Sequence, residues 1–182
     1  WRWYEWRHGL VTRAEPNAAH RALVRLESLV PGFTLVTQNV DGLHQRAGSA
    51  GVRELHGSLL RARCSAGCAE RVAWPAGLDA PPPCRRCGAP LRPDVVWFGE
   101  ALPEEPLAAA WEAAERCDVF LSVGTSNLVQ PAASLPWIAA RRGAFVIVLN
   151  PVAEGQGTGP TIRHLSGAAG MVLPELVRNA FG

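Results

Sequence analysis

The sequence predicts an α/β fold: a parallel sheet with helices on both faces, interrupted by a small inserted zinc-binding module. Short apolar runs of strand length alternate with helix-sized segments along most of the chain, a pattern typical of parallel sheets that are covered on both faces. Four of the five cysteines fall into one motif, C-x3-C, a gap of fifteen residues, then C-x2-C. The 182 residues suffice for one main domain with an insertion and a core of its own.

The first part of the chain predicts two helices, a strand and two shorter pieces. Asn17 is a favourable helix N-cap, and Pro31-Gly32 does not continue a helix, so these residues bound the second helix. The strand that follows is rich in β-branched residues and stops at Gln38-Asn39. The expected elements in order are helices over residues 1–10 (ending near Gly9) and from Pro16-Asn17 to Pro31, a strand over Phe33–Thr37, a helical stretch over Leu43–Arg46 and an extended piece over Val52–His56.

The cysteine motif lies in a module over residues 58–92. We expect its centre, Ala69–Pro83, to be irregular, because it ends in three consecutive prolines. Beyond the module, strands and helices alternate again. The expected elements are the segment Val95–Phe98, helices over Leu107–Arg116 and Ala132–Arg142, strands over Asp118–Val123 and Phe145–Leu149, a glycine-rich loop over Gly155–Gly159, a final short strand and a helix over Pro174–Phe181.

The paired cysteines predict a zinc site. Two closely spaced thiolate pairs supply the tetrahedral four-sulfur environment that zinc prefers, and because four thiolates leave no open position for water or substrate, such a zinc is structural. Two disulfides in a secreted protein are the alternative, which we disfavour because a chain of this length can bury its own core. Reduced cysteines predict a cytoplasmic location. The expected ligands are Cys64, Cys68, Cys84 and Cys87.

Composition excludes several classes of function. A net charge of +2 predicts no specific binding of nucleic acid, and the apolar runs are too short to cross a membrane. All eighteen basic residues are arginine, so neither a Schiff-base lysine nor a P-loop lysine can take part in catalysis.

Three of the predicted strands end in short polar or small residues. These are Gln38-Asn39-Val40-Asp41, Gly124-Thr125-Ser126 and Asn150. Each cluster alone could be only a turn or a helix cap. Since ligands of open α/β sheets bind beyond the carboxyl ends of the strands, the three together favour a crevice for ribose hydroxyls and phosphates.

His56, in the segment Glu54–Gly57, is a candidate general base for a hydroxyl, because the pKa of histidine lies near neutrality. A hydrogen-bonded histidine in a domain hinge is an equally good interpretation from the residues alone. A role as metal ligand is weak, because four cysteines already complete a tetrahedron. His44, which follows Asp41, is a second candidate.

Taken together, these motifs resemble in type and order those of the sirtuins, which are NAD-dependent protein-lysine deacylases. The resemblance runs essentially from end to end. The segments that carry it are Thr37–His44 (TQNVDGLH), Glu54–Gly57 (ELHG), the paired cysteines, Arg92–Glu100 (RPDVVWFGE) and Gly124–Ser126 (GTS). It implies a Rossmann-like NAD-binding domain, N-terminally incomplete, from residues 1–57 and 93–182, with the zinc-binding module at 58–92.

The resemblance also implies individual roles. His56 is the implied catalytic base, which deprotonates a ribose hydroxyl of NAD; the acyl oxygen attacks the ribose carbon as nicotinamide leaves, giving free lysine and O-acyl-ADP-ribose. Val95–Glu100, with Val96, Phe98 and Gly99, is the implied segment that pairs with an acyl-lysine peptide as an added strand. The implied NAD contacts are Gln38, Asn39, Val40, Asp41, Gly124, Thr125, Ser126, Asn150 and Ala169.

Tyr4 and Arg7 refine the expected substrate. They stand three apart, so on a helix they share one face, where a guanidinium and a phenol can hold a carboxylate. Without the resemblance, packing of an aromatic–arginine pair is the better interpretation. With it, Tyr-x-x-Arg is similar to the class III sirtuins, which remove succinyl, malonyl and related acidic acyl groups. We therefore expect activity on succinyl-, malonyl- and also acetyl-lysine.

One departure from the family pattern qualifies these expectations. Sirtuins begin with a strand and a Gly-Ala-Gly-x-Ser loop that cradles the NAD phosphates, and no such segment occurs in residues 1–182. A sheet without its first strand leaves backbone groups unpaired, so we expect residues 1–182 alone to be poorly stable and nearly inactive, and the full-length parent to be the enzyme. Two alternatives stay open: a non-catalytic sirtuin remnant, and a zinc-ribbon module that binds nucleic acid or protein.

Overall fold

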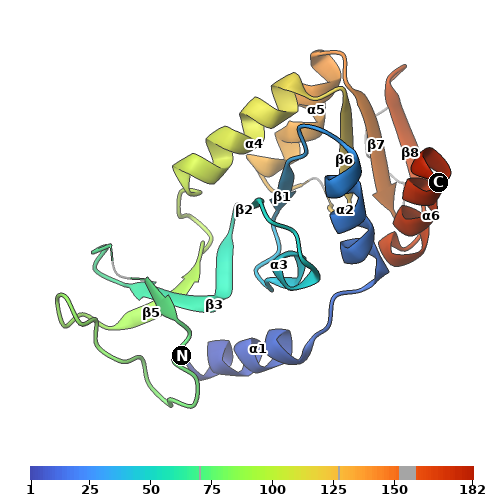
Figure 1. The fold of residues 1–182 in the computed structure, drawn as a ribbon. Helices are drawn as coiled ribbons and strands as arrows, with labels where there is room; N and C mark the ends of the chain where they lie inside the picture. Colours follow the sequence, from blue (N-terminus) through green and yellow to red (C-terminus); the bar gives the residue numbers. More distant parts are fainter. Residues whose placement is uncertain (70, 127, 152–158) are drawn as a thin grey trace.

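The computed structural model describes residues 1–69, 71–126, 128–151 and 159–182, and Figure 1 shows their arrangement. Most of the predicted Gly155–Gly159 loop lies outside the described residues. The elements in chain order are α1 (Arg2–Arg13), α2 (Ala18–Leu29), β1 (Leu35–Thr37), α3 (Leu43–Ala47), β2 (Val52–Glu54), β3 (Gly57–Cys64), β4 (Arg71–Ala73), β5 (Leu91–Val95), α4 (Glu104–Arg116), β6 (Val119–Val123), a 3-10 turn (Ala132–Ser134), α5 (Leu135–Arg141), β7 (Phe145–Asn150), β8 (Ile162–Ser166) and α6 (Ala169–Phe181).

The described strands form three hydrogen-bonded groups. β1 pairs in parallel with β2, and β6, β7 and β8 form a second parallel group in that order. The third group, β4–β3–β5, is antiparallel and contains the cysteine motif. The parallel groups confirm the predicted α/β class. No strand ladder joins β1 to β6 within the part of the chain that the structure describes.

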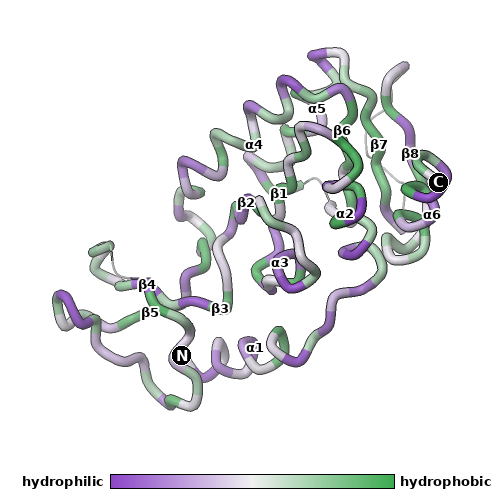
Figure 2. The backbone as a smooth tube through the Cα atoms, in the orientation of Figure 1, coloured by the Kyte–Doolittle hydropathy of each residue, from purple (hydrophilic) through white to green (hydrophobic). Residues whose placement is uncertain are grey.

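Helices cover both faces of the β6–β7–β8 group, as the apolar runs predict. Val146 and Val148 of β7 pack into one cluster with alanines and leucines of α4 and α5. Leu149, the next residue of β7, packs into the other cluster with α2 and α6. Figure 2 shows the hydrophobic stretches along β6 and β7 that supply both cores. Burial on both faces explains why the strand sequence is nearly continuously apolar rather than alternating.

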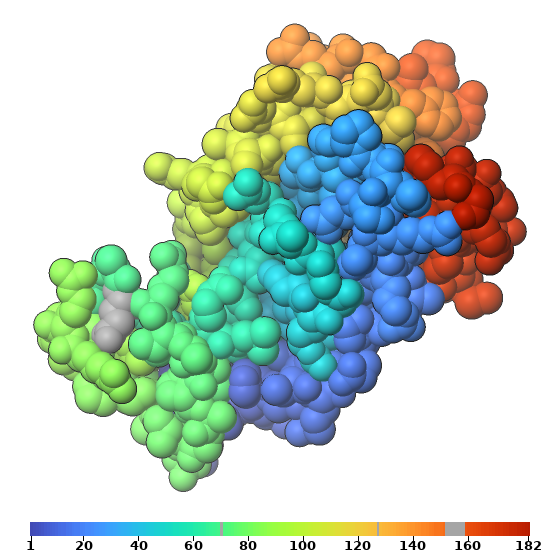
Figure 3. Space-filling model, in the orientation of Figure 1, coloured from blue at the N-terminus to red at the C-terminus, as the bar shows by residue number. Residues whose placement is uncertain are grey.

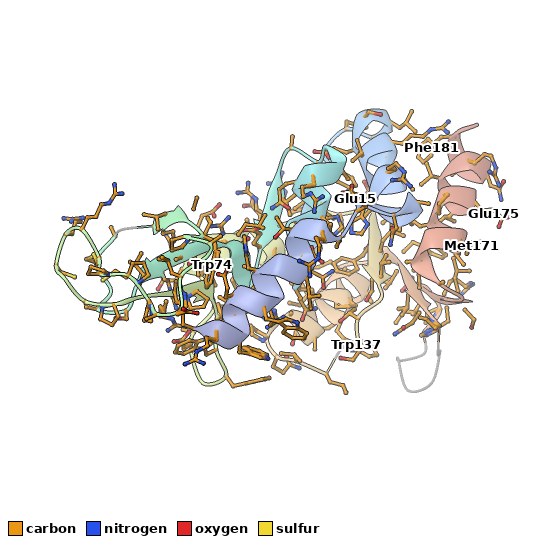
Figure 4. All side chains as sticks on the ribbon, turned by 90° about the horizontal axis from the view of Figure 1, so that it is seen from below. Glu15, Trp74, Trp137, Met171, Glu175 and Phe181 are labelled. Carbon is orange, nitrogen blue, oxygen red and sulfur yellow. The ribbon has the colours of Figure 1, made fainter. Side chains whose placement is uncertain are left out.

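Helix α1 packs on the antiparallel β4–β3–β5 group, far from β7. The indole of Trp1 stacks on that of Trp74, with ring centroids 4.4 Å apart. The Glu5 carboxylate accepts hydrogen bonds from Trp74 Nε1 (2.6 Å) and from the backbone N–H of Gly77 (2.8 Å), which lower the pKa of Glu5. Figure 4 shows Trp74 beside the N-terminal part of α1. In Figure 3 the residues of the antiparallel group, in green, project at one end of the molecule.

The structure confirms the second helix, where Asn17 Oδ1 accepts from the backbone N–H groups of Ala19 (2.9 Å) and His20 (3.3 Å). Other bounds differ from prediction. The first helix continues through Gly9 to Arg13, because one glycine costs a helix only about 1 kcal/mol. The expected Pro174 start of the last helix is also wrong, since α6 begins at Ala169 and contains Pro174.

The centre of the cysteine module is not wholly irregular. Arg71–Ala73 forms β4, which pairs with β3 in antiparallel register, Ala62 lying opposite Val72. This pairing depends on contact with a strand distant in sequence, so local composition gives no sign of it. The segment Val95–Phe98, for which the sequence assigned no conformation, begins at the last residue of β5 and continues beyond that strand.

None of the helices that the structure describes is both long enough and apolar enough to cross a bilayer.

Gly57 of β3 lies so close to the backbone of β5 that its substitution should destabilise the fold. Its φ is +76°, and a Cβ at this position would lie 2.0 Å from the carbonyl oxygen of Asp94. Gly57→Ala should therefore lower the free energy of unfolding by roughly 3 kcal/mol or more, measured by urea denaturation. The control is Gly32→Ala, with φ +72° and open space around the position, which should cost only about 1–2 kcal/mol. Equal losses in the two variants would contradict the close-approach argument.

Candidate functional site

The carboxyl ends of β1, β6 and β7 meet, as the strand-end clusters predict. Gln38 Nε2 donates to Thr125 Oγ1 at 3.3 Å, which links the end of β1 to the end of β6. Asn150 Nδ2, at the end of β7, donates to the backbone carbonyl of Thr125 at 2.9 Å. Gly124 turns the chain at φ +64° and donates its N–H to the carbonyl of Leu149 at 2.9 Å. Amide and hydroxyl groups from three distant segments therefore line one rim.

His56 adjoins this rim, and its hydrogen bond defines its protonation pattern. Its Nδ1 lies 3.1 Å from the backbone carbonyl oxygen of Gln38. A carbonyl can only accept a hydrogen bond, so in the neutral imidazole the proton resides on Nδ1. Nε2 is then the atom with a free lone pair, which is the requirement for a general base. The sequence candidate thus has the correct tautomer for the proposed proton transfer.

Asp41 and His44 lie in a neighbouring cluster. An oxygen of the Asp41 carboxylate accepts from the backbone N–H of Leu43, the first residue of α3, at 3.0 Å. The ring of His44 packs against that of His20, with centroids 4.7 Å apart, and burial lowers the pKa of both histidines. A half-buried imidazole that packs on another imidazole is better explained by a structural role than by the second-base hypothesis.

The segment after β5 lies against His56. Val96 donates its backbone N–H to the carbonyl of His56 at 3.0 Å, while the side chain of Phe98 is fully exposed and Gly99 has φ +87°. Glu100 anchors this segment by accepting from the backbone N–H of Trp97 at 2.9 Å. Hydrogen bonds from Arg92, with further help from Trp97 and Arg63, lower the pKa of Glu100 to about 2, so it is ionised under all ordinary conditions.

Tyr4 and Arg7, predicted as substrate contacts, lie on α1 close to this segment. The hydroxyl of Tyr4 accepts a hydrogen bond from Trp97 Nε1 at 2.7 Å. Arg7 lies with its Cζ 4.9 Å from the centre of the Trp3 ring and makes no ion pair within the described part of the chain. The structure therefore brings the Tyr4 side chain into contact with Trp97, the residue that follows Val96.

The four cysteines of the motif form one sulfur cluster, and none of them is in a disulfide. All four Sγ atoms lie within 4.8 Å of one another, and the Cys68–Cys84 and Cys68–Cys87 sulfurs are 3.2 and 3.8 Å apart. Tetrahedral zinc with bonds of about 2.3 Å requires sulfur separations near 3.8 Å. The cluster therefore fits a structural zinc, held between β3 and the loop before β5.

Some predicted site residues do not join the rim through hydrogen bonds of their own side chains. Ala169 starts α6 and packs in the core with α2, and Ser126 is exposed. Asn39 donates its backbone N–H to Thr37 Oγ1 at 3.1 Å, and the carbonyl of Val40 accepts from Leu59 at 2.8 Å. Their contacts with a ligand remain predictions.

Sequence reasoning missed Trp97 and Arg92. Both lie inside the quoted RPDVVWFGE segment, but Trp97 was passed over in favour of its neighbours. The partner of its indole, Tyr4, is 93 residues away in sequence, so no local pattern could reveal the contact. The one sign of its importance in the sequence is its position between Val96 and Phe98, both of which are expected to contact substrate.

Comparisons with known proteins agree with this geometry. Residues 1–131 match the model of the Sir2 family. A protein of Methylococcus capsulatus named NAD-dependent protein deacylase is 52% identical over 98% of this chain and 72% of its own length. NAD-dependent protein deacylase 1 of Pseudomonas aeruginosa is 49% identical over 100% of this chain and 75% of its own length.

Solved structures show the same similarity. A Sir2 homolog in complex with NAD has a TM-score of 0.90 and 46% identity, covering 98% of this chain and 70% of that one. Sir2Af2 bound to a myristoylated histone peptide has a TM-score of 0.79 and 41% identity, covering 97% and 77%.

The sulfur cluster generates a prediction about metal binding. The purified chain should contain one equivalent of zinc, and Cys84→Ser should weaken zinc binding by more than about a hundredfold, because changes outside the ligand shell already cost about 10- to 100-fold. The control is Cys117→Ser, which removes the fifth cysteine at the end of α4 and should leave zinc content unchanged. Metal content is measured by mass spectrometry and affinity by competition with a chelator. Full zinc content in Cys84→Ser would show that the cluster is not the site.

Proposed function

This chain belongs to the Sir2 family, and from that premise we propose that it is an NAD-dependent protein-lysine deacylase. The observation that carries the proposal is the bond between His56 Nδ1 and the Gln38 carbonyl at 3.1 Å, which leaves Nε2 free to accept a proton beside the rim of polar strand ends. Support also comes from the similarity to relatives named NAD-dependent protein deacylases and to a Sir2 homolog in complex with NAD.

The proposed cofactor position is the rim formed by Gln38, Thr125 and Asn150, since amide and hydroxyl groups suit ribose and phosphate oxygens. NAD supplies the ribose carbon to which the acyl oxygen is transferred as nicotinamide leaves. His56 Nε2 takes the proton of a ribose hydroxyl, and the Gln38 carbonyl stabilises the imidazolium that forms because it accepts from Nδ1.

The proposed substrate is an acyl-lysine in a protein or peptide, bound beside Val96–Gly99. The peptide would pair with this exposed backbone as an added strand, a mode that recognises main chain more than side chains. The fully exposed Phe98 and the turn at Gly99 suit a surface segment that is open to a partner. Acyl-lysine proteins are therefore the partners we propose, with no membrane and no specific nucleic acid.

The proposed acyl group is acidic, succinyl or malonyl, with acetyl also accepted. Arg7 is a cation without an ion-pair partner in the described residues, and Tyr4 lies one helical turn away on the same face of α1. A guanidinium and a phenol can together bind a carboxylate by charge-assisted hydrogen bonds.

We also propose that residues 1–57 and 93–182 form the NAD-binding domain and that residues 58–92 form the zinc-binding module. The zinc would hold β3 and β5 in the relation that places His56 beside Val96. A cytoplasmic location fits four cysteines whose sulfurs are clustered as free thiols, because zinc thiolates persist in a reducing compartment.

The catalytic proposal is tested by nicotinamide release from NAD in the presence of acyl-lysine peptides. Residues 1–182 and the same chain preceded by a sirtuin segment with the Gly-Ala-Gly-x-Ser loop are assayed in parallel. His56→Tyr should lower the rate by at least about a hundredfold, the usual contribution of a general base, while His8→Gln should not. Equal rates for His56→Tyr and its parent would refute the base assignment. Absence of release from both chains would instead favour a non-catalytic remnant.

The acyl preference is tested with matched succinyl- and acetyl-lysine peptides. Arg7→Met should lower kcat/KM for the succinyl peptide by about 10- to 100-fold, because it removes a charged hydrogen-bond donor, and should leave the acetyl peptide nearly unaffected. The control is Arg2→Met, which removes an exposed arginine from the same helix. If the acetyl peptide is the faster substrate and Arg7→Met leaves both rates unchanged, the acidic-acyl proposal is wrong.

A further inference from the structure

Five side chains, from α1, from β5 and from the segment after β5, form a continuous stack. The guanidinium of Arg92 lies over the Trp97 ring at 3.4 Å, and the Trp97 ring stacks with that of Tyr4 at a centroid distance of 6.4 Å. Tyr4 in turn meets the ring of Trp3 edge-on at 4.7 Å, and Arg7 lies over Trp3 at 4.9 Å. Cations thus close both ends of a row of three aromatic rings, an arrangement favoured by the negative faces of the rings.

The two terminal cations differ in their partners. Arg92 hydrogen-bonds both oxygens of Glu100, so its charge is balanced and it serves to hold the stack. Arg7, at the other end, has no carboxylate partner among the described residues. The stack therefore has a balanced charge at its Arg92 end and a net positive charge at its Arg7 end on α1.

The hydrogen bond within the stack has a defined direction. An indole Nε1–H can only donate, so the Tyr4 oxygen is the acceptor in its 2.7 Å bond with Trp97 Nε1. The phenolic hydrogen is therefore not used in this bond. It can be donated to an acceptor, and an ionised carboxylate, which offers only acceptors, is the complementary ligand. The methyl end of an acetyl group offers no such acceptor.

The same tryptophan is tied to the reacting centre. Trp97 follows Val96, whose backbone N–H donates to the carbonyl of His56 at 3.0 Å, and the Trp97 N–H donates to Glu100 at 2.9 Å. Trp97 is thus held at two points. Its backbone directly follows Val96, which contacts His56, and its ring nitrogen donates a hydrogen bond to the Tyr4 hydroxyl. This links the position of the phenol on α1 to that of the proposed general base.

We propose that Trp97 is a positioning residue for acyl specificity, which holds the Tyr4 hydroxyl so that its hydrogen is directed to the carboxylate of an acidic acyl-lysine. The inference rests on the proposed deacylase function and deepens it. Tyr4 and Arg7 touch the acyl carboxylate, whereas Trp97 acts through Tyr4. Arg92, which is hydrogen-bonded to Glu100, lies over the indole ring and helps to fix it.

The kinetic test uses Trp97→Phe, which keeps one aromatic ring in the stack and removes the Nε1–H donor together with the five-membered ring that carries it. KM for the succinyl-lysine peptide should rise by about three- to tenfold, as expected for one hydrogen bond, with kcat nearly unchanged and with no change for the acetyl-lysine peptide. The double variant with Tyr4→Phe should behave like Tyr4→Phe alone, because both changes break the same bond. The control is Trp111→Phe, since this α4 indole is 42% exposed, close to the 43% of Trp97.

A binding readout separates this role from a general effect on the fold. Tyr4 is the one tyrosine of the chain, so tyrosine labelled with ¹³C at the ring carbon that carries the hydroxyl yields a single NMR resonance. The succinyl peptide should shift this resonance and the acetyl peptide should not. In Trp97→Phe the succinyl-induced shift should shrink, while in Trp111→Phe it should persist.

The outcomes distinguish the two proposals. If the chain without substitutions does not prefer the succinyl peptide and Arg7→Met has no effect, the proposal of an acidic acyl substrate is wrong. With that preference intact, equal losses on both peptides in Trp97→Phe, or losses that add to those of Tyr4→Phe, would overturn the role of Trp97. A succinyl-induced shift of full size in Trp97→Phe would overturn it as well.

Discussion

The antiparallel pairing of β3 with β5 is the constraint on which the rest of the site depends. At one end of the pair, Cys64 lies opposite Leu91, so the first cysteine is brought next to the chain that leaves the second cysteine pair. At the other end, Gly57 lies opposite Val95, so His56 comes beside Val96. The close approach at this end is possible because residue 57 has no side chain. One ladder thus sets both the metal cluster and the contact between the proposed base and the proposed substrate segment.

A second layer of contacts attaches α1 to this ladder. The Trp74 ring stacks on that of Trp1, and its Nε1–H donates a hydrogen bond to the Glu5 carboxylate. The Nε1–H of Trp97 donates to the hydroxyl of Tyr4. Both indoles belong to the antiparallel group or its continuation, and both hold the same helix. Aromatic rings suit this task because they bury large apolar areas and still offer a directed N–H group. The position of Arg7 therefore follows from contacts made by other residues of α1.

Ion pairs join the strands of this region. The buried Asp94 lies 3.1 Å from Arg61 Nε and 3.4 Å from Arg71 Nε, and Arg61 also bonds Glu54 of β2 at 2.6 Å. These bonds join β3, β4 and β5 around the Asp94 carboxylate and tie β2 to β3 through Glu54. Arg61, Arg63 and Arg71 of the zinc-binding module are thus engaged with carboxylates of the chain itself. Arginine suits such a network because its planar group can bridge two carboxylates at once.

The features that the sequence by itself determined are those set by interactions between residues close together in the chain. Apolar runs, the Asn17 cap and the cysteine spacing act over a few residues, so the strands of the parallel groups, α2 and the four sulfur ligands were all predictable. The strand-end clusters were likewise correct, because parallel strands necessarily place their carboxyl ends at one edge. His56 was found as a candidate, but its tautomer required the Gln38 carbonyl, which only the fold supplies. The strand β4 and the contact of Tyr4 with Trp97 were decided by tertiary structure alone, since each depends on a partner that chain topology, not neighbouring sequence, brings within reach.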